Sequence, residues 1–282
     1  MRTHVPALVI ASVVIFCGLI FNLVSTLASR QPAAPLAVTA RNCGASAFPR
    51  GALPGATEEE ANPYTSNLRI TSKFSKEDFV PDGKLEKKVW RRAKRVSFSR
   101  DWSGREEFPR VVTHVASLWT STSVYFAFWC PYTDLSVFEG EDPAKERWKL
   151  WERDVVEVYL HPRPEVLKHY YEFQISPNNQ WADLEIDLNK TPFHDLSWTS
   201  NFQHATRVDT AKQIWSCEIR IPLGPIKVSA IDPNSAWRMN VYRNTDVGDS
   251  RRRRSLAWSP ILGVEETNFH VPTRFGIIQF LK

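Results

Sequence analysis

The residues with the clearest chemical pattern lie in the segment WERDVVEVYL, residues 151–160, which begins with Trp151. Two kinds of side chain alternate after it, with Val156, Val158 and Leu160 on one side and Glu157 and Tyr159 on the other. This alternation predicts a strand over residues 155–160 with one face on the core. The other face carries a carboxylate beside an aromatic ring. An aromatic ring stacks on the C–H surface of a sugar and a carboxylate accepts hydrogen bonds from sugar hydroxyls, so the pattern favours a sugar site.

Neighbouring predicted strands carry a similar set of side chains on the side away from their apolar residues. In residues 170–175, 181–188 and 237–244 these outward side chains are Tyr170, Glu172, Gln174, Trp181, Asp183, Glu185, Asp187, Arg238, Asn240 and Tyr242. A plain solvated face would be rich in Lys and Thr, whereas this one is dense in carboxylates, amides and aromatic rings. The composition predicts a binding face. The alternative is structural, because Tyr and Trp also stabilise outer sheet faces through cross-strand pairs.

Two sets of residues allow more than one interpretation. The row Asp183, Glu185 and Asp187 could bind calcium through oxygen ligands, or it could form a solvated strand face, because it lacks the glycine of a compact calcium loop. Cys130 and Cys217 both fall on apolar strand sides. In an exported domain they could form a disulfide, or they could remain buried free thiols.

The charge pattern and the short motifs exclude several functional classes. The formal net charge of +5 is mild for 282 residues, and the run of four arginines at 251–254 is isolated. Nucleic-acid binding usually needs a concentrated basic stripe, so no nucleic-acid partner is expected. No histidine pair has zinc spacing, and the sequence has no nucleophile elbow, phosphate loop or dinucleotide fingerprint.

Short alternating segments, separated by turn signals, predict an all-β fold. Strands are expected over residues 68–74, 95–98, 111–119, 124–129, 155–160, 170–175, 181–188, 202–208, 214–221, 237–244 and 275–281. No long amphipathic helix separates them, and residues 80–90 are expected to hold one short helical turn. This pattern predicts a single antiparallel β-sandwich, jelly-roll or immunoglobulin-like, over residues 67–282.

The N-terminal part of the chain predicts export. Residues 5–28 are almost wholly apolar, long enough to cross a bilayer as a helix. Residues 1–28 are therefore expected to form an N-terminal hydrophobic helix that is a signal-anchor, or a signal peptide with a small-residue cleavage site at 26–28. Residues 29–66, rich in Ala, Pro and Gly, predict a disordered linker. The first alternative gives a single-pass cell-membrane protein with its C-terminal domain outside the cytoplasm; the second gives a secreted or periplasmic one.

Four segments together resemble the family 9 carbohydrate-binding modules. They are WERDVVE at 151–157, the strand 124–129 followed by Asp134, the ending FHVPTRFG at 269–276, and DGKL at 82–85 followed by Trp90. The resemblance covers nearly all of residues 68–282. It implies a β-sandwich that binds sugars, often at chain ends, between two aromatic rings. It also implies Trp151 as one aromatic wall, Glu157 as a hydroxyl acceptor, and structural calcium.

The second aromatic wall is where this sequence departs from the family's pattern. The family places a tryptophan shortly before the closing Pro and Phe-Gly segment, but this chain has Asn268, Phe269 and His270 there. Phe269 could take the place of the tryptophan, or Trp258 could reach the site from the preceding loop. Both are therefore candidate ligand-binding residues.

Three functions are compatible with these expectations. The leading hypothesis is a non-catalytic domain that binds an oligo- or polysaccharide and serves carbohydrate catabolism. The first alternative is a glycoside hydrolase that uses two of the carboxyl groups of Glu157, Glu172, Asp183 and Glu185. The second is a haem-binding electron-transfer domain of the same sandwich type. It would need axial ligands, and Met239, the only internal methionine, is expected on a core-facing position.

Overall fold

The computed structural model describes residues 62–282 apart from residue 141 and the segments 246–252 and 264–265. Within these residues the chain forms strands and short 3₁₀ helices. The strands are β1 (Arg69–Phe74), β2 (Val96–Phe98), β3 (Thr113–Trp119), β4 (Ser123–Pro131), β5 (Val155–His161), β6 (His169–Ile175), β7 (Trp181–Asp187), β8 (His194–Asp195), β9 (Gln203–Asp209), β10 (Ile214–Pro222), β11 (Ala236–Thr245), β12 (Arg254–Ala257) and β13 (Gly276–Leu281). The 3₁₀ helices are η1 (Lys88–Arg92), η2 (Pro109–Val111), η3 (Leu150–Glu152) and η4 (Pro272–Arg274). Every predicted strand is confirmed, and the structure adds the short strands β8 and β12.

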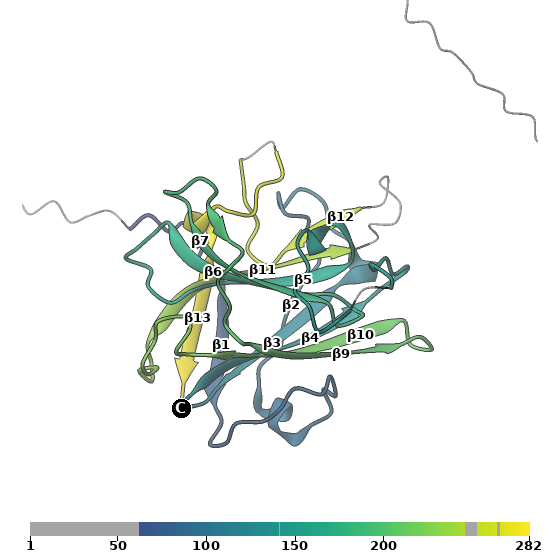
Figure 1. Ribbon diagram of the computed structural model, residues 1–282, viewed down its shortest axis with the longest axis horizontal. Coiled ribbons are helices and arrows are strands. Elements are labelled where there is room, and N and C mark those ends of the chain that lie inside the picture. The colour runs from purple at the N-terminus through teal and green to yellow at the C-terminus, as the bar shows by residue number, and fades with distance from the viewer. Residues whose placement is uncertain (1–61, 141, 246–252, 264–265) are drawn as a thin grey trace, which may run out of the picture. The chain divides into compact units, whose positions relative to one another are not determined.

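The strands belong to one sheet that curls back on itself. Its main path runs β8-β7-β6-β5-β11-β13-β1-β3-β4-β10-β9, while β12 pairs with β11 and β2 with β3. Figure 1 shows the two halves facing each other, with β5, β6 and β11 in one and β3, β4, β9 and β10 in the other. Most pairs are antiparallel, but β1 runs parallel to both β13 and β3. The all-β prediction is confirmed. The antiparallel sandwich is corrected to a single curled, mostly antiparallel sheet, because β1 joins the two halves by parallel pairing.

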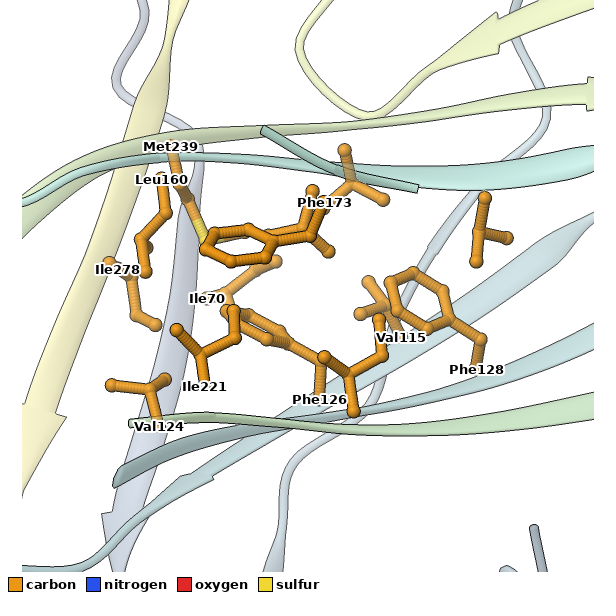
Figure 2. Close-up of a cluster of buried hydrophobic side chains, with 14 of the residues drawn as sticks. Ile70, Val115, Val124, Phe126, Phe128, Leu160, Phe173, Ile221, Met239 and Ile278 are labelled. Atoms are coloured by element: carbon orange, nitrogen blue, oxygen red, sulfur yellow. The ribbon is translucent and has the colours of Figure 1, made fainter. Parts of the chain in front are cut away.

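The main hydrophobic core fills the space between the two halves. In Figure 2, Leu160, Phe173 and Met239 of one half lie opposite Val124 and Phe126 of the other. All five side chains are fully buried. A continuous core of this kind is the dominant favourable term in the stability of such a domain.

Strand β5 follows the predicted alternation. Val156, Val158 and Leu160 lie in the main core, while Glu157 and Tyr159 occupy the other face. The exposure of that second face differs from the prediction, because Glu157 and Tyr159 are also buried. Loops and a second hydrophobic cluster cover the outer face of β5, so this strand is buried on both sides.

The predicted membrane helix and most of the predicted linker, within residues 1–61, lie outside the described residues. In the part of the chain that the structure describes, no helix is long and apolar enough to cross a membrane. Residues just before position 67 already contact the domain. The Tyr64 hydroxyl donates to the Pro164 carbonyl at 2.9 Å, and the Thr65 N–H donates to the Thr273 carbonyl at 2.9 Å.

The DGKL segment and the tryptophan that follows it are anchored on Glu218 of β10. The buried Glu218 carboxylate accepts hydrogen bonds from the backbone N–H groups of Asp82 at 2.7 Å and Gly83 at 2.9 Å. It also accepts from the Trp90 indole N–H at 2.7 Å and the Lys87 ammonium at 2.6 Å. One carboxylate therefore holds the segment that covers the outer face of β3 and β4.

We expect Glu218→Ala to lower the free energy of unfolding by about 3–5 kcal/mol, because it leaves three N–H groups without their acceptor and removes the buried one of the two carboxylates that pair with Lys87. Glu218→Gln should cost less, since its amide oxygen still accepts hydrogen bonds. Urea unfolding followed by tryptophan fluorescence measures both. Asp209→Asn, at an exposed ion pair with Lys212, is the control and should leave stability unchanged. A Glu218→Ala variant as stable as the parent would contradict this anchoring role.

Candidate functional site

A cavity of about 470 Å³ opens on the outer face of β5 and β6, away from the main core. This volume lies in the usual range of small-molecule sites. The cavity brings together many of the predicted binding residues, namely Trp151, Glu157, Tyr159, Glu172, Gln174 and Phe269. Its other lining residues are Trp148, Leu184, Phe193, His194, Asn244, Arg253, Ser255, Thr267, Asn268 and His270.

One wall consists of Trp148 and Trp151, which a tight turn before β5 places side by side. Lys149 adopts a left-handed backbone conformation with φ of 64° and leads into η3. Leu150, which lies between the two tryptophans in the sequence, is fully buried and so anchors this turn to the domain. The indole rings meet edge to face with centroids 4.7 Å apart. Trp148 also packs on His194 of β8, with ring centroids 4.6 Å apart.

Phe269 contributes a second aromatic surface, from the segment that precedes η4. Its ring stacks on Tyr242 with centroids 4.1 Å apart and an interplanar angle of 4°. The Tyr242 hydroxyl also donates to the Phe269 backbone carbonyl at 3.0 Å, so a hydrogen bond reinforces the ring stacking. Trp258, the other candidate for this wall, lies in the main core, where its indole occupies the space beside Gly276 that a Cβ would need.

The floor of the cavity is polar. Glu157, Glu172 and Gln174 are only 1–2% exposed. The Asn244 amide donates to Glu157 Oε1 at 3.1 Å, and the Gln174 amide donates to Glu172 Oε1. Glu172 Oε2 and Gln174 Oε1 are buried without a hydrogen-bond partner. The floor therefore offers two acceptor atoms that a ligand could satisfy.

Burial controls the protonation of these groups. Burial, together with the nearby Glu172 charge, raises the pKa of Glu157 well above its ordinary value. Burial also raises the pKa of Glu172 to about 7. It lowers the pKa of His270 to about 4, helped by His194, so His270 is neutral near pH 7. Without a ligand, the floor therefore favours uncharged side chains.

Three of the remaining predicted residues lie behind the cavity lining. Tyr170 supports His270, with its hydroxyl 2.7 Å from His270 Nδ1. Tyr242 lies under Phe269. Asn240 is one layer further back, where its amide donates to the Tyr242 hydroxyl at 2.8 Å.

Two others do not reach the cavity. Trp181 packs edge to face on Phe202, with ring centroids 5.6 Å apart, at the margin of the main core. Arg238 lies over the ring of Tyr64 at 4.1 Å and donates to the Ser66 carbonyl at 2.9 Å. Both side chains therefore have structural contacts elsewhere in the domain.

The two faces of strand β7 are exchanged relative to the prediction. Leu184, expected in the main core, pairs with Glu172 and lines the cavity, while Asp183 pairs with Phe173 on the main-core side. Buried Asp183 is stabilised there because its carboxylate accepts the Ser200 N–H at 2.6 Å. The sequence pattern of β7 predicted the wrong faces because Ser200, seventeen residues further along the chain, compensates the buried Asp183 carboxylate.

The carboxylates Asp183, Glu185 and Asp187 do not converge on a common point. Glu185 pairs with Lys227 at 2.5 Å and His169 at 2.8 Å, and Asp187 pairs with Lys190 at 3.5 Å. Among the described residues, no group of three or more His, Cys, Asp or Glu side chains is arranged to hold a metal ion. The calcium interpretation of this row has no supporting geometry.

Cys130 and Cys217 are buried free thiols, the second of the two alternatives. They lie diagonally on β4 and β10, since Cys130 pairs with Trp215 and Cys217 with Phe128. Diagonal neighbours are roughly 7–8 Å apart, beyond the usual Cα separation of a disulfide. Met239, the methionine considered for haem, is fully buried in the main core, as the sequence predicted (Figure 2).

Several cavity residues were not predicted, and most of them had only a weak signal in the sequence. Trp148 shares the turn of Trp151, and His270 directly follows Phe269, so both could have been found by proximity. Arg253 belongs to the isolated arginine run at 251–254, which was not predicted to contribute to the site. Phe193 and His194 come from a connection whose approach to Trp148 is purely tertiary.

A second pocket of about 420 Å³ adjoins the cavity. The two share Arg253, Ser255 and Thr267 in their linings. The second pocket adds Asp101, Trp102, Glu106, Phe108 and Arg254. Together they provide adjoining space for a ligand longer than one ring.

The raised pKa of Glu172 predicts a pH-dependent stability. Its pKa is about 7 in the folded state against an ordinary value of 4.5, so the folded protein retains a proton that the unfolded chain releases. The free energy of unfolding should therefore fall as pH rises from 4.5 to 7, by on the order of 3 kcal/mol from this group.

Glu172→Gln cannot titrate, so its stability should decline less over the same pH interval than that of the parent. Urea unfolding at pH 5 and pH 8 measures the difference. Parallel pH profiles for the two proteins would show that Glu172 titrates normally.

Comparison with known proteins agrees with this fold. The profile of the carbohydrate family 9 binding domain-like family matches residues 80–282. An Arthroderma benhamiae protein described as "Extracellular protein" is 23% identical over 198 residues, covering 66% of this chain and 85% of that protein.

Solved structures with the same fold include a candidate carbohydrate-binding protein of Bacteroides uniformis, with a TM-score of 0.62 at 15% identity over 76% of this chain and 100% of that one. A family 9 carbohydrate-binding module of Caldicellulosiruptor kristjanssonii is similar in its complex with cellotriose, with a TM-score of 0.55 at 15% identity over 76% of this chain and 94% of that one. The structure of a family 9 carbohydrate-binding module of the same organism in complex with glucose has a TM-score of 0.54 at 16% identity, over 76% of this chain and 95% of that one. Because the family profile spans most of the chain, this protein belongs to the carbohydrate family 9 binding domain-like family.

Proposed function

We propose that this chain is a non-catalytic carbohydrate-binding protein that holds a sugar ring between aromatic surfaces in the cavity over β5 and β6. The observation that carries the proposal is the arrangement of Trp148, Trp151 and Phe269 around a floor of buried carboxyl and amide groups. Aromatic faces stack on the C–H surface of a sugar. Glu157, Glu172, Gln174 and Asn244 then provide acceptors and donors for its hydroxyl groups.

Family membership supports the same class of ligand. The Caldicellulosiruptor kristjanssonii module, which has a similar fold, was solved in complex with cellotriose and with glucose. The adjoining second pocket favours an oligosaccharide for this chain, because a sugar in the cavity can continue past Arg253 toward Trp102. The description of the Arthroderma benhamiae relative as an extracellular protein supports a role outside the cytoplasm.

The chemistry of the floor favours binding over hydrolysis. Of the four carboxyl groups considered for a hydrolase, only Glu157 and Glu172 line the cavity. The usual mechanisms need one protonated and one ionised carboxyl group beside the scissile bond. Here burial raises the pKa values of both groups, so the free site disfavours the ionised carboxylate that these mechanisms need.

Trp151→Ala should weaken oligosaccharide binding at least tenfold, because it removes a stacking surface worth about 1 kcal/mol beyond its buried area. Titration calorimetry of the full chain with cellotriose and xylotriose measures the affinity. Trp129→Ala is the matched control, since Trp129 is a partly exposed tryptophan of β4 that lies under Arg95 and does not line the cavity. If Trp151→Ala and the parent bind the oligosaccharides with equal affinity, Trp151 does not contribute to the sugar-binding site.

Trp102→Ala tests the extension into the second pocket. It should weaken trisaccharide binding about threefold to tenfold through the lost stacking surface and leave monosaccharide binding unchanged. The same calorimetric titration, with a mono- and a trisaccharide of one sugar, measures the difference. Equal losses for both ligands would place Trp102 in a structural role instead.

A further inference from the structure

The two carboxyl groups on the cavity floor have no cationic partner among the described residues. Glu157 contacts the Asn244 amide, and Glu172 contacts the Gln174 amide. The nearest ring nitrogen, His270 Nε2, is 4.0 Å from Glu172 Oε2, beyond hydrogen-bond distance. Buried carboxyl groups are normally paired with a cation or kept protonated. When either carboxyl group ionises, none of the described residues therefore places a cation within hydrogen-bond distance of it.

The basic groups around the cavity do not meet that requirement. Arg253 lowers the pKa of Glu157 only as a minor influence, and its exposed guanidinium donates to the Trp151 carbonyl at 3.3 Å. His270 is kept neutral near pH 7 by burial. His194 packs on Trp148, with ring centroids 4.6 Å apart. A positive group on the ligand would therefore supply what no described residue does, a cation within hydrogen-bond distance of the two carboxyl groups.

The lining is also suited to a cation in other ways. The rings of Trp148, Trp151, Tyr159 and Phe269 surround the space, and the faces of aromatic rings attract cations. The unpartnered acceptors Glu172 Oε2 and Gln174 Oε1 lie on the floor. An ammonium group has three N–H donors, whereas a hydroxyl has one, so an ammonium can satisfy both acceptors at once.

We propose that the cavity selects sugars that carry a free, protonated amine, such as glucosamine units, over the corresponding neutral sugars. This inference rests on the proposed sugar-binding function and names its ligand class. The amine would lie against Glu172 and Gln174, while the ring stacks on the tryptophan wall. The selectivity is local, because a chain with a formal net charge of +5 repels cations in general.

The test compares three disaccharides with the same β-1,4 linkage and ring stereochemistry: the glucosamine disaccharide, cellobiose and diacetylchitobiose. Titration calorimetry of the full chain at pH 7 should give a dissociation constant at least tenfold lower for the glucosamine disaccharide than for the other two. Acetylation removes the charge and keeps the nitrogen, so diacetylchitobiose separates the charge from the shape of the ligand.

Two matched variants assign the selectivity to its carboxyl group. Glu172→Gln should reduce the preference for the glucosamine disaccharide over cellobiose, with both affinities measured on the variant, to below threefold. Glu185→Gln makes the same substitution on neighbouring β7, where the side chain pairs with Lys227 and His169 outside the cavity, and should keep the preference. Circular dichroism establishes that each variant is folded.

Each result decides a distinct claim. If cellobiose binds as tightly as the glucosamine disaccharide or more tightly, the amine inference fails and the proposed sugar-binding function stands. If none of a broad set of sugars binds, both fail. If Glu172→Gln retains the tenfold preference, Glu172 is not the group that recognises the amine, and the inference is overturned.

Discussion

The strands β5 and β6 are covered on both faces, and the site depends on this constraint. Because side chains alternate along a strand, each residue that fills the main core is followed by one that lines or supports the cavity. Val158 and Leu160 thus lie on either side of Tyr159, and Phe173 lies between Glu172 and Gln174. The packing of the main core therefore also fixes the backbone that carries the floor residues of the site. A floor built on strands positions its groups more accurately than one built on loops.

The same constraint explains the chemistry of the site. Carboxyl groups placed under aromatic walls lose their contact with water, and this raises the pKa values of Glu157 and Glu172. Two acceptor atoms there have no protein partner. A fold tolerates buried carboxyl groups and unpaired acceptors at a functional site when the polar groups elsewhere in the domain have their hydrogen-bond partners. Glu218 provides the contrast in the other half of the sheet, since four donors from one segment saturate its buried carboxylate.

Local patterns predicted most of the strands and part of the site. Alternation placed the strands correctly, and the types of Trp151, Glu157 and Phe269 were sufficient to suggest residues that line one cavity. What failed depended on contacts between distant residues. The phase of β7 depends on Ser200, which stabilises Asp183 on the core side. The position of Trp258 depends on Gly276, whose missing side chain makes room for the indole.

The loops that close the cavity were the least predictable part. Phe193, His194 and the segment around Asn268 converge on Trp148 and Trp151 only after the sheet has curled. Their sequences carry no periodic signal, because their contacts are set by the ends of β7, β12 and η4 rather than by an internal pattern. Sequence reasoning could therefore propose Trp151 and Phe269 as aromatic surfaces, and the structure shows that both line one cavity, together with Trp148, Phe193 and His194.

The most direct measurement is a crystal structure of the chain grown with a saturating oligosaccharide. The account predicts one sugar ring against Trp148 and Trp151, with Phe269 on its other side and its polar groups within hydrogen-bond distance of Glu172 and Gln174. An empty cavity, or a sugar bound on another face while the cavity stays unoccupied, would contradict the central claim.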